Sequence, residues 1–422
     1  MKKSSWICRL LGTLFLVTTA GSARADLAGL NSPPGPETRL PTALPRAIPN
    51  PAAADTMGSS LAQAADGTTY LSWLEPVGVE KWAMKFSRFD SGLQQWGAAR
   101  IIAQGADWFI NWADFPFLTV QQEQLTAVWF VNNPGGGHGH HESTYHAQYS
   151  VSTDGGVTWS PPQPLTRESN SVEFATLQPL RDGRLLAAWL DGRAHAASSD
   201  RQALYARILA APGPDLLVDD SVCDCCQLSL APTAEGGALL AYRGRTKDEV
   251  RDIHLARFTG QSWNDPNPLH ADNWKISGCP VNGPQLTVAG DRTGVVWFTS
   301  AGNQPQVLAR VSVDAGKSFG PVHRIDLGRP QGRVDCVLLA DGTLALIWLE
   351  AVGIGSEAAG GIYLRTLSPA GLLSAPRMIL PSRTDRMSGF ARMILASAKS
   401  VLLTCTQDRE PSRIATFLID LE

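Results

Sequence analysis

Four cysteines and a histidine-rich stretch are the residues of this chain best suited to bind a metal ion. The cysteines stand in Cys223-Asp224-Cys225-Cys226 and in the later segment Gly278-Cys279-Pro280. Three or four thiolates suit a soft or borderline ion such as Cu(I) or Zn(II). A glycine-rich loop adds imidazole groups at His138, His140 and His141. The pattern therefore predicts a copper or zinc site built from two or three loops.

Disulfide bonding is the alternative chemistry for the same cysteines, because their spacing matches no standard zinc motif. Cys225 and Cys226 are sequence neighbours about 3.8 Å apart at Cα, so a bridge between them would be strained. A bridge from this segment to Cys279 is expected instead in an exported protein. In that case the histidine loop is a solvated turn. Cys336 and Cys405 lie within expected strands and are interpreted as small core residues.

Acidic, arginine and tyrosine side chains offer a second chemistry, that of carboxylate binding and acid–base catalysis. Arginines from separate repeats can hold a carboxylate through paired hydrogen bonds, and acids can donate or accept a proton. The candidates for substrate binding are Arg193, Arg251, Arg333, Asp335 and Asn111, and those for catalysis are Asp114, Glu173, Asp252 and Tyr242. If the chemistry includes a tyrosine nucleophile, Tyr242 is the candidate, with Glu173 or Glu249 as its partner. Alternatively, the charged pairs are salt-bridge struts and Tyr242 is a packing residue.

A repeat of about 55 residues must position these side chains. Its marker is a β-rich stretch that ends in an aromatic residue, often after an Asp-Gly turn. The markers are Trp73, Trp129, Trp189, Tyr242, Trp297 and Trp348, with Thr404 in the equivalent place of a last copy. Each copy divides into short strands with no sustained helical period, which predicts an all-β propeller of seven four-stranded blades. A stacked β-solenoid is the structural alternative.

The loops of such a propeller bring the candidate residues to one face. Loops that enter the first strand of a blade, and loops that join its second strand to its third, open around the axis on the same side. The candidate cysteines, histidines, acids and arginines all fall in these loops, and Tyr242 ends a second strand near them. We therefore expect a polar mouth, the place where propellers usually bind ligands.

The segments before the repeats predict export. Lys2, Lys3 and Arg9 precede a short apolar run, and Ala23-Arg24-Ala25 fits a cleavage site, so residues 1–25 are interpreted as a signal peptide. An uncleaved anchor is the alternative. Residues 26–55 form a Pro/Ala-rich arm, and residues 56–422 form the propeller domain. The last copy ends after its third strand, so the arm near residues 40–48 is expected to supply the outer strand and close the ring.

The overall composition excludes several classes of protein. With 44% hydrophobic residues, 18% charged residues and a net charge of −3, the chain is neither disordered nor fibrous. It has no basic stripe, so a nucleic-acid partner held through phosphate groups is excluded. No later segment reaches a transmembrane length, and the mature protein is expected to be periplasmic or secreted.

Two copies of one turn motif connect the chain to a known family. Ser152-Thr153-Asp154-Gly155-Gly156-Val157-Thr158-Trp159 stands between the third and fourth strands of the second copy, and Ser312-Val313-Asp314-Ala315-Gly316-Lys317-Ser318-Phe319 has the same place in the fifth. In this Asp-box the Asp accepts backbone N–H groups, Gly supplies the unusual φ and the aromatic ring packs between strands. With these motifs residues 56–422 resemble the sialidase (neuraminidase) superfamily of Asp-box, or BNR-repeat, propellers.

The resemblance implies a glycan-directed function and a specific set of site residues. Sialidases of this family generally have six blades, an Arg-Ile-Pro element, three arginines on the substrate carboxylate, an Asp acid/base and a Tyr nucleophile paired with Glu. In this chain the opening element is interrupted as Arg46-Ala47-Ile48-Pro49, the last copy has no tyrosine, and seven repeats replace six. We therefore expect weak or absent turnover of simple α-sialosides.

The functional expectation is an exported, monomeric propeller that acts on or binds glycans or a small anionic ligand. Its enzymatic form is an exo-α-sialidase-type glycoside hydrolase that requires no cofactor. The alternative is a non-catalytic propeller that binds a ligand or a metal, with copper or zinc as the ion.

Overall fold

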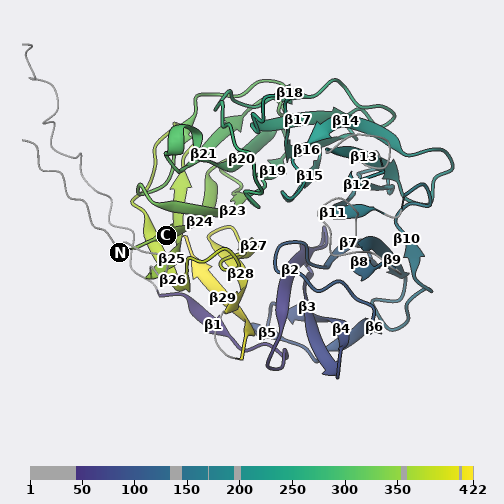
Figure 1. Cartoon of the computed structure of the whole chain (residues 1–422). Helices are drawn as coiled ribbons and strands as arrows, with labels where there is room; N and C mark the ends of the chain where they lie inside the picture. The colour runs from purple at the N-terminus through teal and green to yellow at the C-terminus, as the bar shows by residue number, and fades with distance from the viewer. Residues whose placement is uncertain are drawn as a thin grey trace, which may run out of the picture. The chain divides into compact units, whose positions relative to one another are not determined.

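Seven antiparallel sheets follow one another along the chain and stand in a ring, with the first strand of each sheet nearest the centre (Figure 1). The computed structural model describes residues 44–133, 145–169, 171–193, 201–352, 359–407 and 411–421. This architecture confirms the predicted all-β propeller and the count of seven blades. The predicted signal peptide and the three histidines of the glycine-rich loop lie outside the described residues. Within the described ranges, no helix has the length and hydrophobicity needed to cross a membrane.

Each of the first four blades is built from strands that are consecutive in the chain. Blade one contains β2 (Met57–Gln63), β3 (Thr69–Gly78), β4 (Lys81–Asp90), β5 (Gln95–Trp96) and β6 (Arg100–Gly105). Blade two contains β7 (Phe117–Gln121), β8 (Gln124–Asn132), β9 (Tyr145–Ser152) and β10 (Gln163–Pro164). Blade three contains β11 (Val172–Pro179), β12 (Leu185–Asp191), β13 (Gln202–Ile208) and β14 (Leu216–Val222). Blade four contains β15 (Ser229–Pro232), β16 (Ala238–Arg243), β17 (Ile253–Phe258) and β18 (Asn267–Pro268).

The last three blades complete the ring. Blade five contains β19 (Gln285–Ala289), β20 (Arg292–Thr299), the 3-10 turn η2 (Ala301–Asn303), β21 (Gln306–Ser312) and β22 (His323–Arg324). Blade six contains β23 (Pro330–Leu338), β24 (Leu344–Ala351), β25 (Ala359–Leu367) and β26 (Arg377–Arg383). Blade seven contains β27 (Arg392–Ser397), β28 (Ser400–Gln407), β29 (Arg413–Asp420) and, as its outer strand, β1 (Arg46–Ile48).

The N-terminal arm closes the ring, as the sequence predicts. Strand β1 pairs antiparallel with β29, with Arg46 opposite Leu418 and Ile48 opposite Thr416. The Thr416 hydroxyl donates a 2.6 Å hydrogen bond to the carbonyl of Ile48, and the Ile48 side chain is buried. Both ends of the described chain therefore belong to one blade, which covers an edge that would otherwise be unpaired.

The second strand of each blade forms the core between neighbouring blades. Strands β12, β16 and β24 are buried along their whole length, which explains why they are continuous apolar runs without alternation. The six aromatic markers and Thr404 all lie on second strands and are buried. In three blades the indole N–H of the marker donates to a carboxylate two residues later, at Glu75, Asp191 and Glu350. This Trp-x-Glu/Asp pattern satisfies a buried donor and was not singled out in the sequence.

Both Asp-boxes have the geometry that their sequence predicts. In the first, Asp154 accepts hydrogen bonds from the backbone N–H groups of Val157 and Thr158 at 3.0 and 2.9 Å, and from the Thr158 hydroxyl at 2.6 Å. These donors hold the pKa of Asp154 well below its usual value. The ring of Trp159 packs edge-on against Phe86 of blade one, with 6.0 Å between ring centroids. The first Asp-box is therefore a structural turn whose aromatic residue joins two neighbouring blades, and it has no catalytic geometry.

We predict that the substitution Gly156→Ala destabilises the protein more than Gly155→Ala does. Both glycines have positive φ, 82° and 68°, so both substitutions carry the backbone cost of the left-handed region. A Cβ at residue 156 would lie 2.2 Å from the ring of Phe86, whereas a Cβ at residue 155 meets nothing within 4 Å. Overpacking should make the first variant less stable than the second by about 1–3 kcal/mol in denaturant unfolding. Equal losses would contradict the inter-blade contact.

Candidate functional site

The cysteines of two neighbouring entry loops come together at the mouth. The Sγ atom of Cys223 lies 3.3 Å from that of Cys226 and 4.0 Å from that of Cys225, and the three sulfurs lie within 4.8 Å of one another. Cys279, from the entry loop of blade five, is exposed, and its thiol contacts Cys225. None of these cysteines is bridged in the structure. The predicted grouping of four thiols is thus present, and its role as disulfide or metal site stays a prediction.

Arginines surround this cysteine cluster. The Arg251 guanidinium donates to Cys223 Sγ at 3.4 Å and to the carboxylate of Glu249 at 2.7 Å. Arg243 is fully buried and stacks on the ring of Trp274, 4.7 Å from its centroid. Burial opposes ionisation of Cys226, but hydrogen bonds with the neighbouring thiols and the charge of Arg243 lower its pKa well below the usual value.

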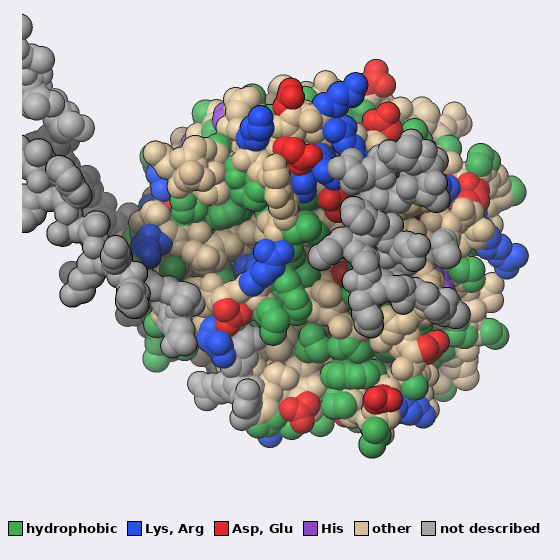
Figure 2. Space-filling model, viewed as in Figure 1, with side chains coloured by type: hydrophobic (Ala, Val, Ile, Leu, Met, Phe, Trp, Pro, Cys, Tyr) green, Lys and Arg blue, Asp and Glu red, His purple; other side chains and the backbone are tan. Residues whose placement is uncertain are grey.

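A second group of charged residues lies beside the cluster. The guanidinium of Arg245 is shared by the carboxylates of Glu249 and Asp224, at 2.8 and 3.1 Å. In Figure 2 basic and acidic side chains gather side by side over the part of the ring that contains β15–β18. Glu249 therefore pairs with two arginines, Arg245 and Arg251.

A buried acid, a tyrosine and a glutamate meet where blades two and three adjoin. The hydroxyl of Tyr145, at the start of β9, donates to Asp114 Oδ2 at 2.8 Å, and the backbone N–H of Phe174 donates to the same oxygen at 2.8 Å. The Tyr145 hydroxyl also forms a hydrogen bond with Glu173. Burial raises the pKa of Asp114 to about 8, against the effect of these two donors. One phenolic hydrogen cannot serve two carboxylates, so one carboxyl of this group must keep its proton. When Asp114 keeps it, the Asp114 carboxyl donates to the Tyr145 oxygen and the Tyr145 hydroxyl donates to Glu173.

The backbone of the first strands aims residues into this region. Strand β11 has a bulge after Glu173, where Phe174 has a φ of 47°, and β23 has a similar bulge, where Arg333 has a φ of 55°. Bulges of this kind redirect side chains, and positive φ at non-glycine residues is strained. The sequence shows no glycine at Phe174, so the bulge in β11 could not be predicted. In β23 Gly332 directly precedes Arg333, and a glycine within a strand is a signal for a bulge.

The axial channel contains a cavity that Asp114 helps to line. This cavity has a volume of about 400 Å³ and is lined by first-strand residues of all seven blades. Asp335 and Arg392 also line it. Burial raises the pKa of Asp335, although Arg392 acts in the opposite direction. The carboxylate of Asp335 accepts the backbone N–H groups of Met393 and Cys336 at 2.8 and 2.9 Å.

A smaller aromatic pocket of about 190 Å³ opens beside the channel. Trp112, Phe115 and Phe390 line it, and the rings of Trp112 and Phe390 lie 5.9 Å apart. The guanidinium of Arg333 stacks on Phe390 at 4.3 Å and donates to the backbone carbonyls of Val281, Arg386 and Ser388. Burial lowers the pKa of Arg333 to about 10, with the charge of Arg386 acting in the same direction.

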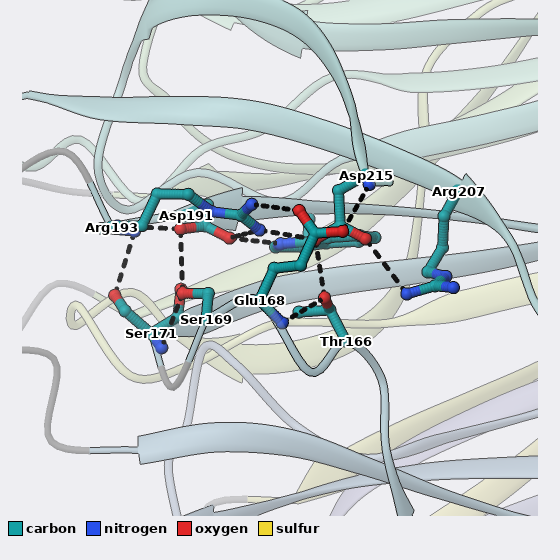
Figure 3. A network of polar contacts seen from close by, with 10 residues as sticks. Thr166, Glu168, Ser169, Ser171, Asp191, Arg193, Arg207 and Asp215 are labelled. Atoms are coloured by element: carbon teal, nitrogen blue, oxygen red, sulfur yellow. Dashed lines mark hydrogen bonds and ion pairs between the residues drawn. The ribbon is translucent and has the colours of Figure 1, made fainter. Parts of the chain in front are cut away.

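The three arginines proposed to grip a carboxylate have separate partners. Figure 3 shows Arg193 within an acidic network of blade three, where it pairs with Asp191 and Asp215 at 2.7 Å each and with Glu168 at 3.2 Å. Arg251 is held by Glu249, and Arg333 is held by backbone carbonyls. Arg251 contacts Cys223, and the charge of Arg333 interacts with Cys226. These contacts fit the alternative interpretation of the charged residues, in which they form structural salt bridges and hydrogen bonds.

Tyr242 is packed between blades. Its side chain is buried, and its hydroxyl donates to Asp219 Oδ2 at 2.6 Å. Burial and the Asp219 charge raise the pKa of Tyr242. Glu173, its proposed partner, pairs instead with Tyr145. The packing interpretation of the marker position therefore fits this residue.

The remaining candidates hold loops in place. Asp252 accepts the backbone N–H groups of Asn273 and Trp274 at 2.9 and 3.0 Å. The Asn111 amide oxygen accepts those of Ala113 and Asp114 at 2.7 and 3.2 Å, which fixes the loop that carries Asp114. Sequence reasoning missed Tyr145. The signal that could have found it is its position directly after the histidine loop, at the entry to a third strand.

Comparisons with known proteins agree with the fold. Residues 78–294 match the family model of the BNR repeat-like domain. Among solved structures, the chain is similar to a protein of unknown function from Dyadobacter fermentans, with 12% identity over 90% of this chain and 98% of that chain and a TM-score of 0.51. At this identity the similarity concerns the fold alone.

Two further similar structures carry sialidase names. One is a Hadza microbial sialidase, with 14% identity over 87% of this chain and 66% of that chain and a TM-score of 0.46. The other is the intramolecular trans-sialidase from Ruminococcus gnavus, with 11% identity over 78% and 94% and a TM-score of 0.48. No curated protein sequence matches the chain significantly.

Proposed function

Since the chain belongs to the BNR repeat-like domain family of sialidase-like propellers, we propose that it acts on glycans at the mouth of its axial channel. The proposed substrate is a neutral glycan, and the proposed chemistry is proton donation from Asp114 to a glycosidic oxygen. The observation that carries the proposal is the group of Asp114, Tyr145 and Glu173 beside the channel cavity.

Glycoside hydrolysis needs one carboxyl group that holds a proton and a second that is ionised. A pKa of about 8 keeps Asp114 protonated at neutral pH, so it can act as a general acid. Glu173 is only partly buried and supplies the second carboxylate. Because the hydroxyl of Tyr145 contacts both groups, their nearest oxygens lie within roughly 6 Å of each other. We propose that Tyr145 and Glu173, which share a hydrogen bond, take the place of the Tyr–Glu pair that the family resemblance implies.

The preference for a neutral glycan follows from the existing partners of two candidate arginines, Arg193 and Arg333. Arg193 is neutralised by three carboxylates, and Arg333 is occupied by three carbonyl groups. Binding a sialic acid carboxylate would require these contacts to break, which is costly for partly or fully buried groups. The aromatic pocket of Trp112, Phe115 and Phe390 offers apolar ring faces on which an uncharged sugar can pack.

We predict that neutral glycosides are turned over and that simple α-sialosides are turned over weakly or not at all. The assay uses a panel of fluorogenic α-sialosides and neutral glycosides with the purified chain. Asp114→Asn should lower kcat by roughly 10²–10⁴-fold, the usual contribution of a general acid.

Two tyrosine variants make a matched comparison, because each hydroxyl forms a hydrogen bond with an Asp side chain. Tyr145→Phe should impair turnover, whereas Tyr242→Phe should leave it close to that of the parent protein. Robust α-sialoside turnover that is abolished by Tyr242→Phe would overturn the proposal and identify Tyr242 as the nucleophile. Glycan binding on an array without any turnover would favour the non-catalytic alternative.

A further inference from the structure

We propose that Cys223, Cys225 and Cys226 bind one Cu(I) ion at the mouth, independently of the proposed action on glycans. Their sulfur atoms are 3.3 and 4.0 Å apart along two edges, and all three lie within 4.8 Å of one another. Three thiolates placed about 2.3 Å from a shared ion are roughly 3.8–4.0 Å apart. The observed triangle therefore needs only small side-chain shifts to close around an ion.

The number of converging sulfurs selects the ion. Cys279 contacts Cys225 but lies exposed at the edge of the cluster, outside the triangle. Structural zinc sites are almost always four-coordinate and tetrahedral, whereas soft thiolate ligands also suit Cu(I). A compact set of three thiols with a fourth at its margin thus favours Cu(I) over Zn(II).

The surroundings compensate the charge of the loaded site. Binding releases to solvent the protons that the three thiols still hold and forms three Cu–S bonds, while copper stays in the +1 state. The product carries a net charge of −2. The guanidinium of Arg251 lies 3.4 Å from Cys223 Sγ, and its orientation is fixed by Glu249. Since Cys223 and Cys226 are each only 1% exposed, this nearby cation offsets a charge that water does not reach.

The loop that carries the cluster is held independently of an ion. Gln227 donates from Nε2 to the carbonyl of Ala113 at 2.9 Å, and its Oε1 accepts the backbone N–H of Gly283 at 3.2 Å. These contacts tie the cysteine loop to the entry loops of blades two and five. The thiols are therefore brought together before metal binds, which lowers the entropic cost of forming the site.

The test is an anaerobic titration of the reduced protein, purified without a histidine tag, with Cu(I) held by a competing chelator. We expect one Cu(I) per chain. Loss of a residue that only hydrogen-bonds to a metal ligand lowers metal affinity by roughly 10–100-fold. Cys226→Ser removes a ligand itself, so it should lower the Cu(I) affinity by more than this. Cys336→Ser, which alters a similarly buried thiol in β23, should leave the affinity unchanged. Equal effects of the two variants would contradict the site.

X-ray absorption of the copper-loaded parent protein removes any dependence on variant folding. Three sulfur neighbours at about 2.3 Å would support the proposal. Preferential binding of Zn(II) by four sulfurs, with loss of the ion in Cys279→Ser, would overturn the three-coordinate copper site. Alkylation of the unfolded, unreduced protein followed by peptide mapping should label all three cysteines. A bridge between Cys223 and Cys226 would also overturn the proposal. The copper-binding and alkylation results do not bear on glycoside turnover, which is measured separately.

Discussion

Replacing Arg243 with methionine is expected to lower the free energy of unfolding by about 3–5 kcal/mol, because buried carbonyl groups would lose their donors. Arg243 donates to the carbonyls of Arg251, Asn282 and Phe298, at 2.6, 2.8 and 2.7 Å. These carbonyls belong to two neighbouring blades and their loops. Methionine fills a similar volume but donates no hydrogen bond, and water does not reach a side chain that is 1% exposed.

Arg310 provides the matched control. It also donates to three backbone carbonyls, those of Leu269, Phe319 and Gly320, and it also stacks on an aromatic ring, that of Phe319. Arg310 is only partly buried, so water can replace its hydrogen bonds. Arg310→Met should therefore cost about 1 kcal/mol in denaturant unfolding. Equal losses of unfolding free energy in the two variants would show that burial does not determine how much the Arg243 hydrogen bonds contribute to stability.

The stability of the protein is expected to fall as the pH rises from about 4 to about 8, through the titration of Asp114. In the folded state this carboxyl keeps its proton up to a pKa of about 8, whereas an unfolded Asp releases it near pH 4. Within this window the folded state binds one more proton than the unfolded state, so rising pH favours unfolding. The slope is at most about 1.4 kcal/mol for each pH unit, and the effect is constant above the window.

Denaturant unfolding at a series of pH values isolates this contribution. Asp114→Asn cannot titrate, and its amide oxygen can still accept from Tyr145 and Phe174. The stability difference between the variant and the parent protein should therefore grow in favour of the variant between pH 4 and pH 8.

Asp154→Asn is the control of opposite sign. Hydrogen bonds lower the pKa of Asp154, so its contribution to stability is present above about pH 4 and is lost only in more acidic solution. A difference between Asp114→Asn and the parent protein that stays constant from pH 4 to pH 8 would show that Asp114 is ionised in the folded state. That outcome would also remove the general acid from the proposed function.

The sequence alone determined the architecture, because local patterns specify it. Seven markers from Trp73 to Thr404 repeat at a regular interval, and each lies on the second strand of a blade. The Asp-boxes were predicted with their contacts, since Ser152, Asp154 and Thr158 interact within one short turn. Closure by the arm followed from counting strands, because an unpaired outer edge in the last copy needs a partner.

The identity of the site was decided only by the tertiary structure. Tyr145 and Phe174 follow Asp114 by 31 and 60 residues, and the three meet because two blades adjoin. No periodic pattern encodes which side chain a loop from another blade will face. The pKa of Asp114 likewise depends on burial, and the partners of Arg193 come from separate loops of one blade. Sequence patterns report short-range geometry, whereas the electrostatic environment of a side chain arises from contacts between distant segments. For that reason only the folded chain could distinguish structural salt-bridge residues from acids and arginines that can take part in catalysis.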